Sequence, residues 1–159
     1  MLILLLGSNL GDRKSHLLKA RDMIESRIGP IVKISAIYET ESWGIPGQPD
    51  FLNQALIIET GHAPEELLKR TQAIEKKMGR LHSGIRYVSR IIDIDILFYG
   101  RLILSTPDLV IPHPQVELRR FALVPLVEMV PYFMHPSTGK NMKQLLEECN
   151  DPLFVKKYL

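Results

Sequence analysis

Hydrophobic and polar residues recur with two different periods along the first hundred positions of this 159-residue chain. Apolar runs or alternation predict four strands, at 1–6, 32–39, 51–58 and 91–99. Apolar residues at helical spacing predict two helices, through Leu17 to Ile28 and from Pro64 to Met78. The order βαββαβ predicts an α+β fold of the ferredoxin-like type. In it, an antiparallel sheet carries both helices on one face and leaves the other face free for ligands.

Beyond Gly100 the chain adds shorter elements to this core. We expect a strand near 102–104, a proline-rich loop at 111–114, and helical segments around 117–130 and 141–149. The chain has no internal repeat and no low-complexity segment. The sequence therefore predicts a single domain that spans residues 1–159.

Charge and cysteine usage narrow the class of protein. The net charge of +2 is too small to imply a nucleic-acid or membrane partner. The apolar start at 2–6 is short and runs directly into Gly7, so it reads as a buried strand and not as a signal peptide or a membrane span. The single cysteine, Cys149, cannot form an internal disulfide. We expect a cytoplasmic monomer that binds small molecules.

The strand at 91–99 contains two acids, Asp93 and Asp95, separated by one residue. Strand side chains alternate between faces, so both carboxylates project to the same side, with Cα atoms roughly 6.6 Å apart. We expect the isoleucines and the phenylalanine between and after them to anchor the strand beneath the helices, on the opposite face: Ile92, Ile94, Ile96 and Phe98.

Paired carboxylates in an apolar strand repel one another and lose hydration, so a cation would stabilise them. Two magnesium ions about 4 Å apart would suit phosphoryl transfer. Taken alone, the pair fits a solvated strand face equally well. Arginines in the preceding segment favour the site, because guanidinium groups bind phosphate oxygens, although any single one fits a solvated loop as well: Arg80, Arg86 and Arg90.

Four further positions allow two interpretations each. Phe51 followed by Asn53 could stack on a flat heterocycle and bind its edge, but a core phenylalanine is the simpler explanation. His113 lies between two prolines, where a structural turn is as consistent as a ligand role. Trp43 suits a lid residue or a buried anchor.

Several segments, in this order, resemble the family of 6-hydroxymethyl-7,8-dihydropterin pyrophosphokinases along nearly the whole chain. They are Gly7–Gly11, Gln48–Asn53, Pro64–Leu68, Arg86-Tyr87 before Asp93–Leu97, and Ile111–Pro114 with Arg119 and Phe121. The resemblance implies an ATP-dependent enzyme of folate biosynthesis, which transfers a diphosphate to the pterin alcohol and releases AMP.

The resemblance also implies roles for individual residues. Asp93 and Asp95 would ligate both magnesium ions and, with Arg80 and Arg90, carry the catalysis. The pterin would contact Thr40, Trp43, Gly44, Phe51, Asn53 and Phe121. ATP would contact Gln72, Glu75, Arg80, Arg86, Tyr87, Arg90, Ile96, His113 and Arg119. Three loops, near 8–15, 41–50 and 80–90, would close over the substrates.

The chain departs from the pattern of this family at three places, which are Val88-Ser89, His82 and Glu41-Ser42. These departures bear on loop stiffness, phosphate binding and lid closure. Val88-Ser89 is the one hint of an alternative, a catalytically silent pterin or nucleotide sensor. A second alternative is an RNA-binding module, because RNA-recognition domains share the βαββαβ order. Leu56, Ile57 and Ile58 lack the spaced rings of such domains, which argues against it.

Overall fold

The structure is a computed structural model that describes residues 1–43, 46–80 and 89–158. It is an α+β fold built on a six-stranded antiparallel sheet, in which β5, β1, β4, β3 and β8 lie in this order and β2 also pairs with β4. In chain order the elements are β1 (Leu2–Ser8), α1 (Arg13–Arg27), β2 (Ile31–Ile34), β3 (Tyr38–Thr40), β4 (Phe51–Ile58), α2 (Pro64–Lys77), β5 (Asp93–Tyr99), β6 (Leu104–Ser105), β7 (Val110–Ile111), a 3-10 turn (Val116–Leu118), α3 (Arg120–Met129), α4 (Met142–Glu148) and β8 (Val155–Lys157).

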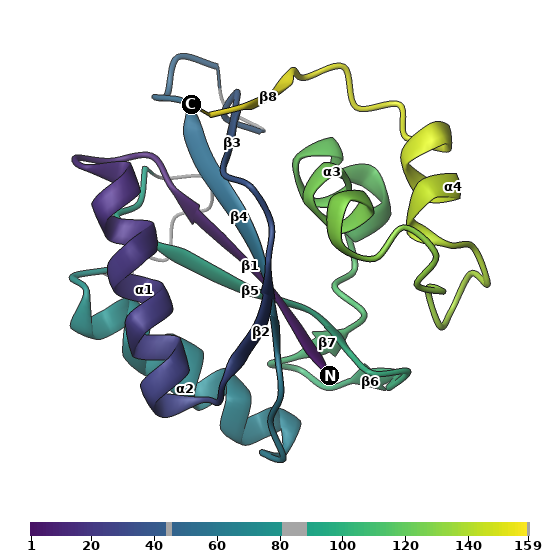
Figure 1. The fold of residues 1–159 in the computed structure, drawn as a ribbon, viewed down its shortest axis with the longest axis horizontal. Helices are drawn as coiled ribbons and strands as arrows, with labels where there is room; N and C mark the ends of the chain where they lie inside the picture. Colours follow the sequence, from purple (N-terminus) through teal and green to yellow (C-terminus); the bar gives the residue numbers. More distant parts are fainter. Residues whose placement is uncertain (44–45, 81–88, 159) are drawn as a thin grey trace.

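Helices cover both faces of the sheet (Figure 1). Helices α1 and α2 pack on one face, and α3 and α4 pack on the other. Strand β1 is a continuous apolar run because both of its faces are buried. Leu4 points into the core under α1 and α2, and Ile3 points into the core under α3. The prediction that the second face is free for ligands is therefore wrong for this part of the sheet, since the C-terminal helices bury it.

Helix α2 begins and ends as its sequence predicts. Pro64 opens it, with Glu65 and Glu66 in the first turn, where acidic side chains complement the helix dipole. Gly79 adopts a left-handed φ of 99° directly after the helix, and its N–H donates to the Lys76 carbonyl. This reversal turns the chain back along α2 and brings residue 80 toward β5.

The predicted strand at 32–39 is wrong as a single element, because the structure divides it into β2 and β3. Ser35 causes the break. Its backbone N–H donates to the Ala55 carbonyl, and its hydroxyl accepts the Ala55 N–H, both at 3.0 Å, so the side chain replaces a ladder hydrogen bond of the strand.

Phe98 lies on the opposite face from its predicted one. Ile92, Ile94 and Ile96 pack under α1 and α2 as expected, but the pairing of β5 with β1 shifts register between Leu4 and Ile3. This irregularity makes Leu97 and Phe98 both face α3 and α4. The alternation that predicted Phe98 holds only up to this bulge.

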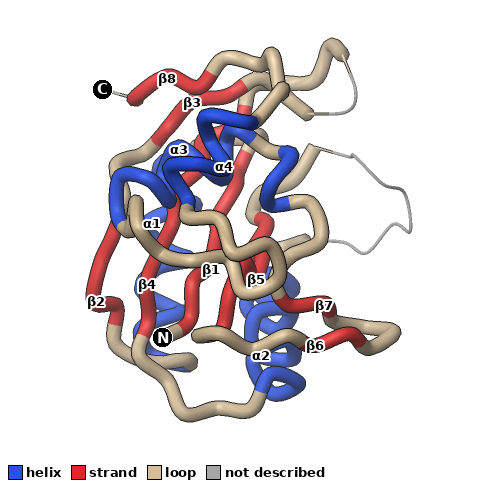
Figure 2. Tube along the Cα trace, turned by 90° about the vertical axis from the view of Figure 1, so that its right-hand side faces the viewer, coloured by secondary structure: helices blue, strands red, loops and turns tan. Residues whose placement is uncertain are grey.

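The segment after β5 forms the predicted additions with small shifts. The strand expected near 102–104 is Leu104–Ser105, which pairs with β7, and the two lie beside the end of β5 (Figure 2). The two predicted C-terminal helices are present as α3 and α4. Among the described residues, none of the helices has the length and apolar composition needed to cross a bilayer.

Candidate active site

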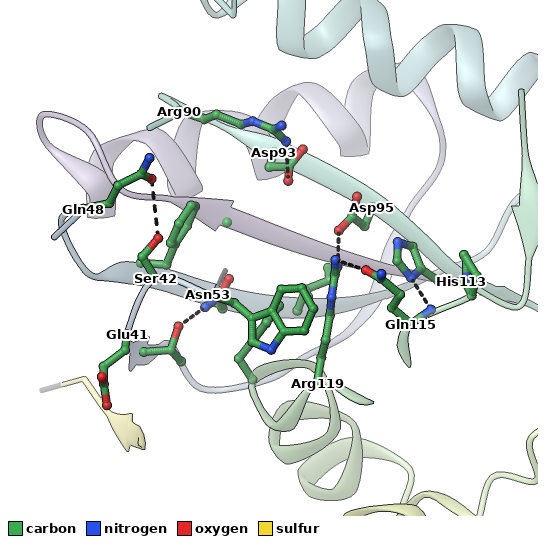
Figure 3. A pocket seen from close by; sticks show the side chains of 17 residues that line it. Glu41, Ser42, Gln48, Asn53, Arg90, Asp93, Asp95, His113, Gln115 and Arg119 are labelled. Atoms are coloured by element: carbon green, nitrogen blue, oxygen red, sulfur yellow. Dashed lines mark hydrogen bonds and ion pairs between the residues drawn. The ribbon is translucent and has the colours of Figure 1, made fainter. Parts of the chain in front are cut away.

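A cavity of about 380 Å³ opens where β5, β4 and the segment before α3 meet. Figure 3 shows side chains from these elements, among them Asn53, Asp93, Asp95 and Arg119, together with Ser42 and Gln48 from the segment between β3 and β4. Its lining residues are Leu5, Gly7, Thr40, Glu41, Ser42, Trp43, Gln48, Phe51, Asn53, Arg90, Asp93, Asp95, His113, Pro114, Gln115, Arg119 and Phe121.

Asp93 and Asp95 both line this cavity, so the predicted shared orientation of the two carboxylates is confirmed. Two arginines hold the Asp93 carboxylate, one at each oxygen. Arg80 Nη1 lies 2.7 Å from Oδ1, and Arg90 Nη1 lies 3.0 Å from Oδ2. The Asp93 side chain is 24% exposed and lines the cavity together with Arg90, whereas Arg80 does not line it.

Asp95 has weaker compensation than Asp93. Among the residues that the structure describes, its ion-pair partner is Arg119, with 3.9 Å between Nη1 and Oδ2 (Figure 3). Burial raises the pKa of Asp95, and the neighbouring Asp93 charge raises it further, while Arg119 acts in the opposite direction. A cation at this carboxylate would therefore relieve a cost that the protein alone leaves in place.

Glu75 is a third acid in the same neighbourhood, but it lies behind the cavity. Its carboxylate accepts the Ile94 N–H at 2.8 Å and forms an ion pair with Arg80. Burial is the main cause that raises the pKa of Glu75, and the Asp93 charge adds to it. Only 3% of the residue is exposed.

The other end of the cavity combines rings with a buried amide. Phe51 and Phe121 line it, together with Asn53, whose Nδ2 donates to the Thr40 hydroxyl at 2.7 Å. A Cβ at Gly7 would lie 3.0 Å from Asn53 Oδ1, so glycine is needed there to leave space for this amide. The arrangement can accept a flat ring with a polar edge.

Arg119 links the two ends of the cavity. Its guanidinium carbon lies 5.0 Å from the ring centre of Trp43 and 5.5 Å from that of Phe121, both in the range of a cation–π contact. It also donates to Gln115 (Figure 3). Trp43 therefore belongs to the wall of the cavity.

A second cavity of about 250 Å³ adjoins the first, and the two share Asp95, His113 and Pro114. The remaining lining residues are mostly apolar and come from α2, β5, β7 and the connection between β6 and β7: Leu68, Ile94, Ile96, Pro107, Asp108, Leu109 and Val110. Asp95 therefore stands at the junction between the two cavities.

Comparison with known proteins decides the family. The family model described as 7,8-dihydro-6-hydroxymethylpterin-pyrophosphokinase (HPPK) matches residues 3–131. The chain belongs to the HPPK family. This confirms the resemblance, and with it the enzyme class expected from the sequence, an ATP-dependent pyrophosphokinase of folate biosynthesis.

Individual HPPK relatives agree with this assignment. A 2-amino-4-hydroxy-6-hydroxymethyldihydropteridine pyrophosphokinase of Aquifex aeolicus (strain VF5) is 41% identical over 90% of this chain and 88% of that protein. The enzyme of the same name from Bacillus subtilis (strain 168) is 41% identical over 78% of this chain and 74% of that protein.

A likeness to solved structures supports the fold alone. The HPPK-DHPS of Plasmodium falciparum with pteroate has a TM-score of 0.76 at 18% identity, over 92% of this chain. This chain spans 42% of the length of that protein.

The structure brings most residues of the predicted HPPK site together and leaves some apart. Ile96 lines the second cavity and His113 lines both. Gln72 is exposed and, like Glu75 and Arg80, lines neither cavity. Gly44, Arg86 and Tyr87 lie outside the described residues, as do His82 and Val88, so the predicted closure of the three loops stays a prediction.

Two contributions escaped the sequence interpretation. Gln115 lines the cavity and binds Arg119, and its only signal was a position two residues after His113. Asn9 is 2% exposed; its side-chain oxygen accepts the Arg90 N–H at 2.6 Å, and its own N–H donates to the Arg90 carbonyl at 3.1 Å. Its place in Gly7–Gly11 indicated a turn, not this partner.

Magnesium fits the chemistry of the acid pair. Within 1–43, 46–80 and 89–158, no group of three or more His, Cys, Asp or Glu side chains could hold a metal ion. Two carboxylates supply hard oxygen ligands and leave the rest of an octahedral shell to phosphates and water, as magnesium prefers. The raised pKa of Asp95 agrees with this, because a bound cation would favour the ionised form.

Proposed function

We propose that this chain transfers the diphosphate of ATP to the hydroxymethyl group of 6-hydroxymethyl-7,8-dihydropterin and releases AMP. The observation that carries the proposal is the position of Asp95 at the junction of a ring-lined cavity and a mostly apolar second cavity. A reacting phosphate chain that spans both cavities would pass the acids and the three arginines that contact them, which are Arg80, Arg90 and Arg119.

The ring-lined end would bind the pterin. Phe51 and Phe121 offer apolar ring surface, and the Asn53 amide, oriented by Thr40, would read the polar edge of the heterocycle. Trp43 would extend this wall. The second cavity would take the nucleoside of ATP, beside Ile96 and His113.

In the proposed reaction, the pterin hydroxyl oxygen attacks the β-phosphorus of ATP. The bond between that phosphorus and the oxygen bridging to the α-phosphate breaks, AMP departs with that oxygen, and the hydroxyl proton passes to solvent. Arg90 and Arg119 would stabilise the charge that moves between the phosphates. Two magnesium ions held by Asp93 and Asp95, when bound, would neutralise phosphate charge and align the reacting groups.

The proposal also covers the fold type, the cellular location and the oligomeric state. The order β5, β1, β4 with β2 and β3 beyond supports a ferredoxin-like core for the first 99 residues. A single cysteine, 9% exposed, is compatible with a cytoplasmic location. A monomer is proposed because the two cavities need no residue from a second chain, and analytical ultracentrifugation would test it.

The deciding experiment measures AMP release with ATP and magnesium, with and without the pterin alcohol. We expect release only when the alcohol and magnesium are both present. A matched control uses 6-methyl-7,8-dihydropterin, which lacks the attacking oxygen and should bind without AMP release. Binding of both pterins with no AMP from either would favour a silent sensor and overturn the proposal. Binding of single-stranded RNA that is insensitive to ATP and magnesium would favour the RNA-binding alternative.

A further inference from the structure

Glu75 contacts Ile94 and Arg80 among the described residues outside its helix, and it lines neither cavity. Its carboxylate accepts the Ile94 N–H at 2.8 Å and pairs with the Arg80 guanidinium. Its backbone carbonyl accepts the Arg80 N–H at 3.0 Å. Arg80 is thus held by the same residue at its backbone and at the tip of its side chain.

The sequence around Glu75 explains this double contact. Glu75 lies one helical turn before Gly79, whose φ of 99° reverses the chain. The reversal places Arg80 back over the last turn of α2, within reach of both the carbonyl and the carboxylate of Glu75. A side chain at residue 79 would be strained in this conformation. Gly79 therefore allows the reversal that brings Arg80 to Glu75.

Arg80 stands between two acids of unequal burial. Its Nη1 contacts Oε1 of Glu75, whose side chain is 5% exposed, and Oδ1 of Asp93, whose side chain is 24% exposed. Asp93 faces the cavity, so substrate groups can reach it and exchange its partners, whereas Glu75 has no such access. A bond to Glu75 is therefore the one that would persist when Asp93 binds something else.

Simple packing does not require an acid at this position. A buried carboxylate loses hydration, and an apolar side chain of similar volume would fill the same space at lower cost. The carboxylate instead satisfies one backbone N–H of β5 and one guanidinium of the site. Both partners of Glu75 flank Asp93, which is the next residue before Ile94 on the strand.

We infer that Glu75 is a positioning residue, which anchors Arg80 from the interior so that the guanidinium meets the reacting phosphates, and does not itself contact the nucleotide. The inference rests on the proposed function. It differs from the role implied by the family resemblance, in which Glu75 would lie near the nucleoside.

A double-mutant cycle tests this inference. We expect Glu75→Gln, which keeps an acceptor for the Ile94 N–H but removes the charge, to lower kcat about 10- to 100-fold with little change in KM for the pterin. In an Arg80→Ala background, the same change should cost less than about twofold, because the group it positions is gone. Equal losses in both backgrounds would overturn the inference.

The matched control is Glu66→Gln on the same helix. Glu66 pairs with Arg70 at 2.9 Å, with side chains that are 44% and 35% exposed, and neither residue lines either cavity. We expect its activity to stay within about twofold of the wild type, as for other exposed pairs. If Glu75→Gln does not fold, Glu75→Asp replaces it, since it keeps the charge and shortens the reach; its loss should likewise vanish with Arg80→Ala.

A second measurement separates this inference from the proposed function. It is calorimetry of α,β-methylene ATP binding, which needs no turnover. The proteins compared are the wild type, Glu75→Gln, Arg80→Ala and the double variant. We expect about tenfold weaker binding for Glu75→Gln and no further weakening in the double variant. If the wild type released no pterin-dependent AMP, the proposed function would fail, and the binding cycle would still decide the role of Glu75. Additive losses of affinity would contradict that role.

Discussion

Two histidines that precede a proline form the same local hydrogen bond in two different parts of the molecule. His113 Nδ1 accepts the N–H of Gln115 at 3.2 Å, beside the cavity. His135 Nδ1 accepts the N–H of Ser137 at 3.2 Å, beneath α3 and α4. The histidine–proline turn is therefore a property of local sequence, and it does not by itself mark a functional site.

The surroundings of the two turns differ. Around His113 lie Asp95 and Arg119, which line the same cavity. His135 instead packs edge-on against the Phe98 ring, with 5.5 Å between centroids, and is 4% exposed. Glu117 Oε1 also lies 3.9 Å from His135 Nε2. The comparison teaches that the cavity region gathers charges of both signs around its histidine, whereas His135 meets one carboxylate and an aromatic ring. The predictions below test that division.

The largest expected effect is on the cavity side, from Asp95→Asn. Removal of one of the two charges proposed to ligate magnesium should lower AMP release by about three orders of magnitude or more. The melting temperature should not fall, because the variant removes a carboxylate whose pKa is raised by burial. Steady-state turnover and thermal unfolding measure the two effects, with the exposed Asp22→Asn as control. Near-normal turnover would remove Asp95 from the metal site.

On the core side, Phe98→Ala should show the reverse pattern. The Phe98 ring is fully buried and packs at 5.1 Å between centroids from Phe133. Loss of such a ring costs about 3–5 kcal/mol of unfolding free energy. Urea unfolding measures this loss, and turnover per folded molecule should stay within about twofold. A loss below about 1 kcal/mol, or a fall in specific activity, would contradict the division between the two regions.

The two turns should share a dependence on pH. Burial, with help from Arg119, lowers the pKa of His113 to about 4, and burial lowers the pKa of His135. Both folded-state values lie below the unfolded value of about 6.5, so the unfolded state binds more protons below that pH. The free energy of unfolding should therefore fall as pH decreases from about 6.5 toward about 4. Urea unfolding at several pH values measures this fall. In each of His113→Asn and His135→Asn, the free energy of unfolding should decrease less steeply with falling pH than in the wild type. An unchanged pH dependence would refute the lowered pKa of the histidine that was replaced.

The smallest expected effect is at the start of α4, on the core side. Asn141 Oδ1 accepts the Gln144 N–H, and the Gln144 side chain accepts the Asn141 N–H, both at 2.9 Å. Asn141→Ala should cost about 1 kcal/mol by removing this capping box, without a change in turnover. The exposed Glu147→Ala serves as control in the same unfolding experiment. A change in turnover would show that the α3–α4 core and the cavity are coupled.

Local patterns in the sequence predicted much of this fold. Apolar periodicity placed both long helices and three of the four core strands, and strand alternation placed Asp93 and Asp95 on one face. It failed where a side chain or a register shift overrides alternation. The Ser35 hydroxyl divides one predicted strand, and the bulge in β5 moves Phe98 to the other face.

The partners within the site were less accessible to sequence reasoning. Arg80, Arg90 and the two acids are close in sequence, so their proximity could be expected. Asn9 meets Arg90 across 81 positions, and the Trp43 ring meets Arg119, which follows it much later in the chain. Contacts of this kind depend on how distant segments pack, and a single sequence carries no local signal for them.

The bulge at Leu97 changes which core the side chains of β5 enter. Before the bulge, Asp93 and Asp95 alternate with isoleucines that pack under α1 and α2. After it, Leu97 and Phe98 both pack toward α3 and α4. The bulge lies beyond the two acids, so it leaves Asp93 and Asp95 on the face that strand alternation gives them. One short strand thus supplies side chains to both cores of the protein as well as the paired acids of the cavity.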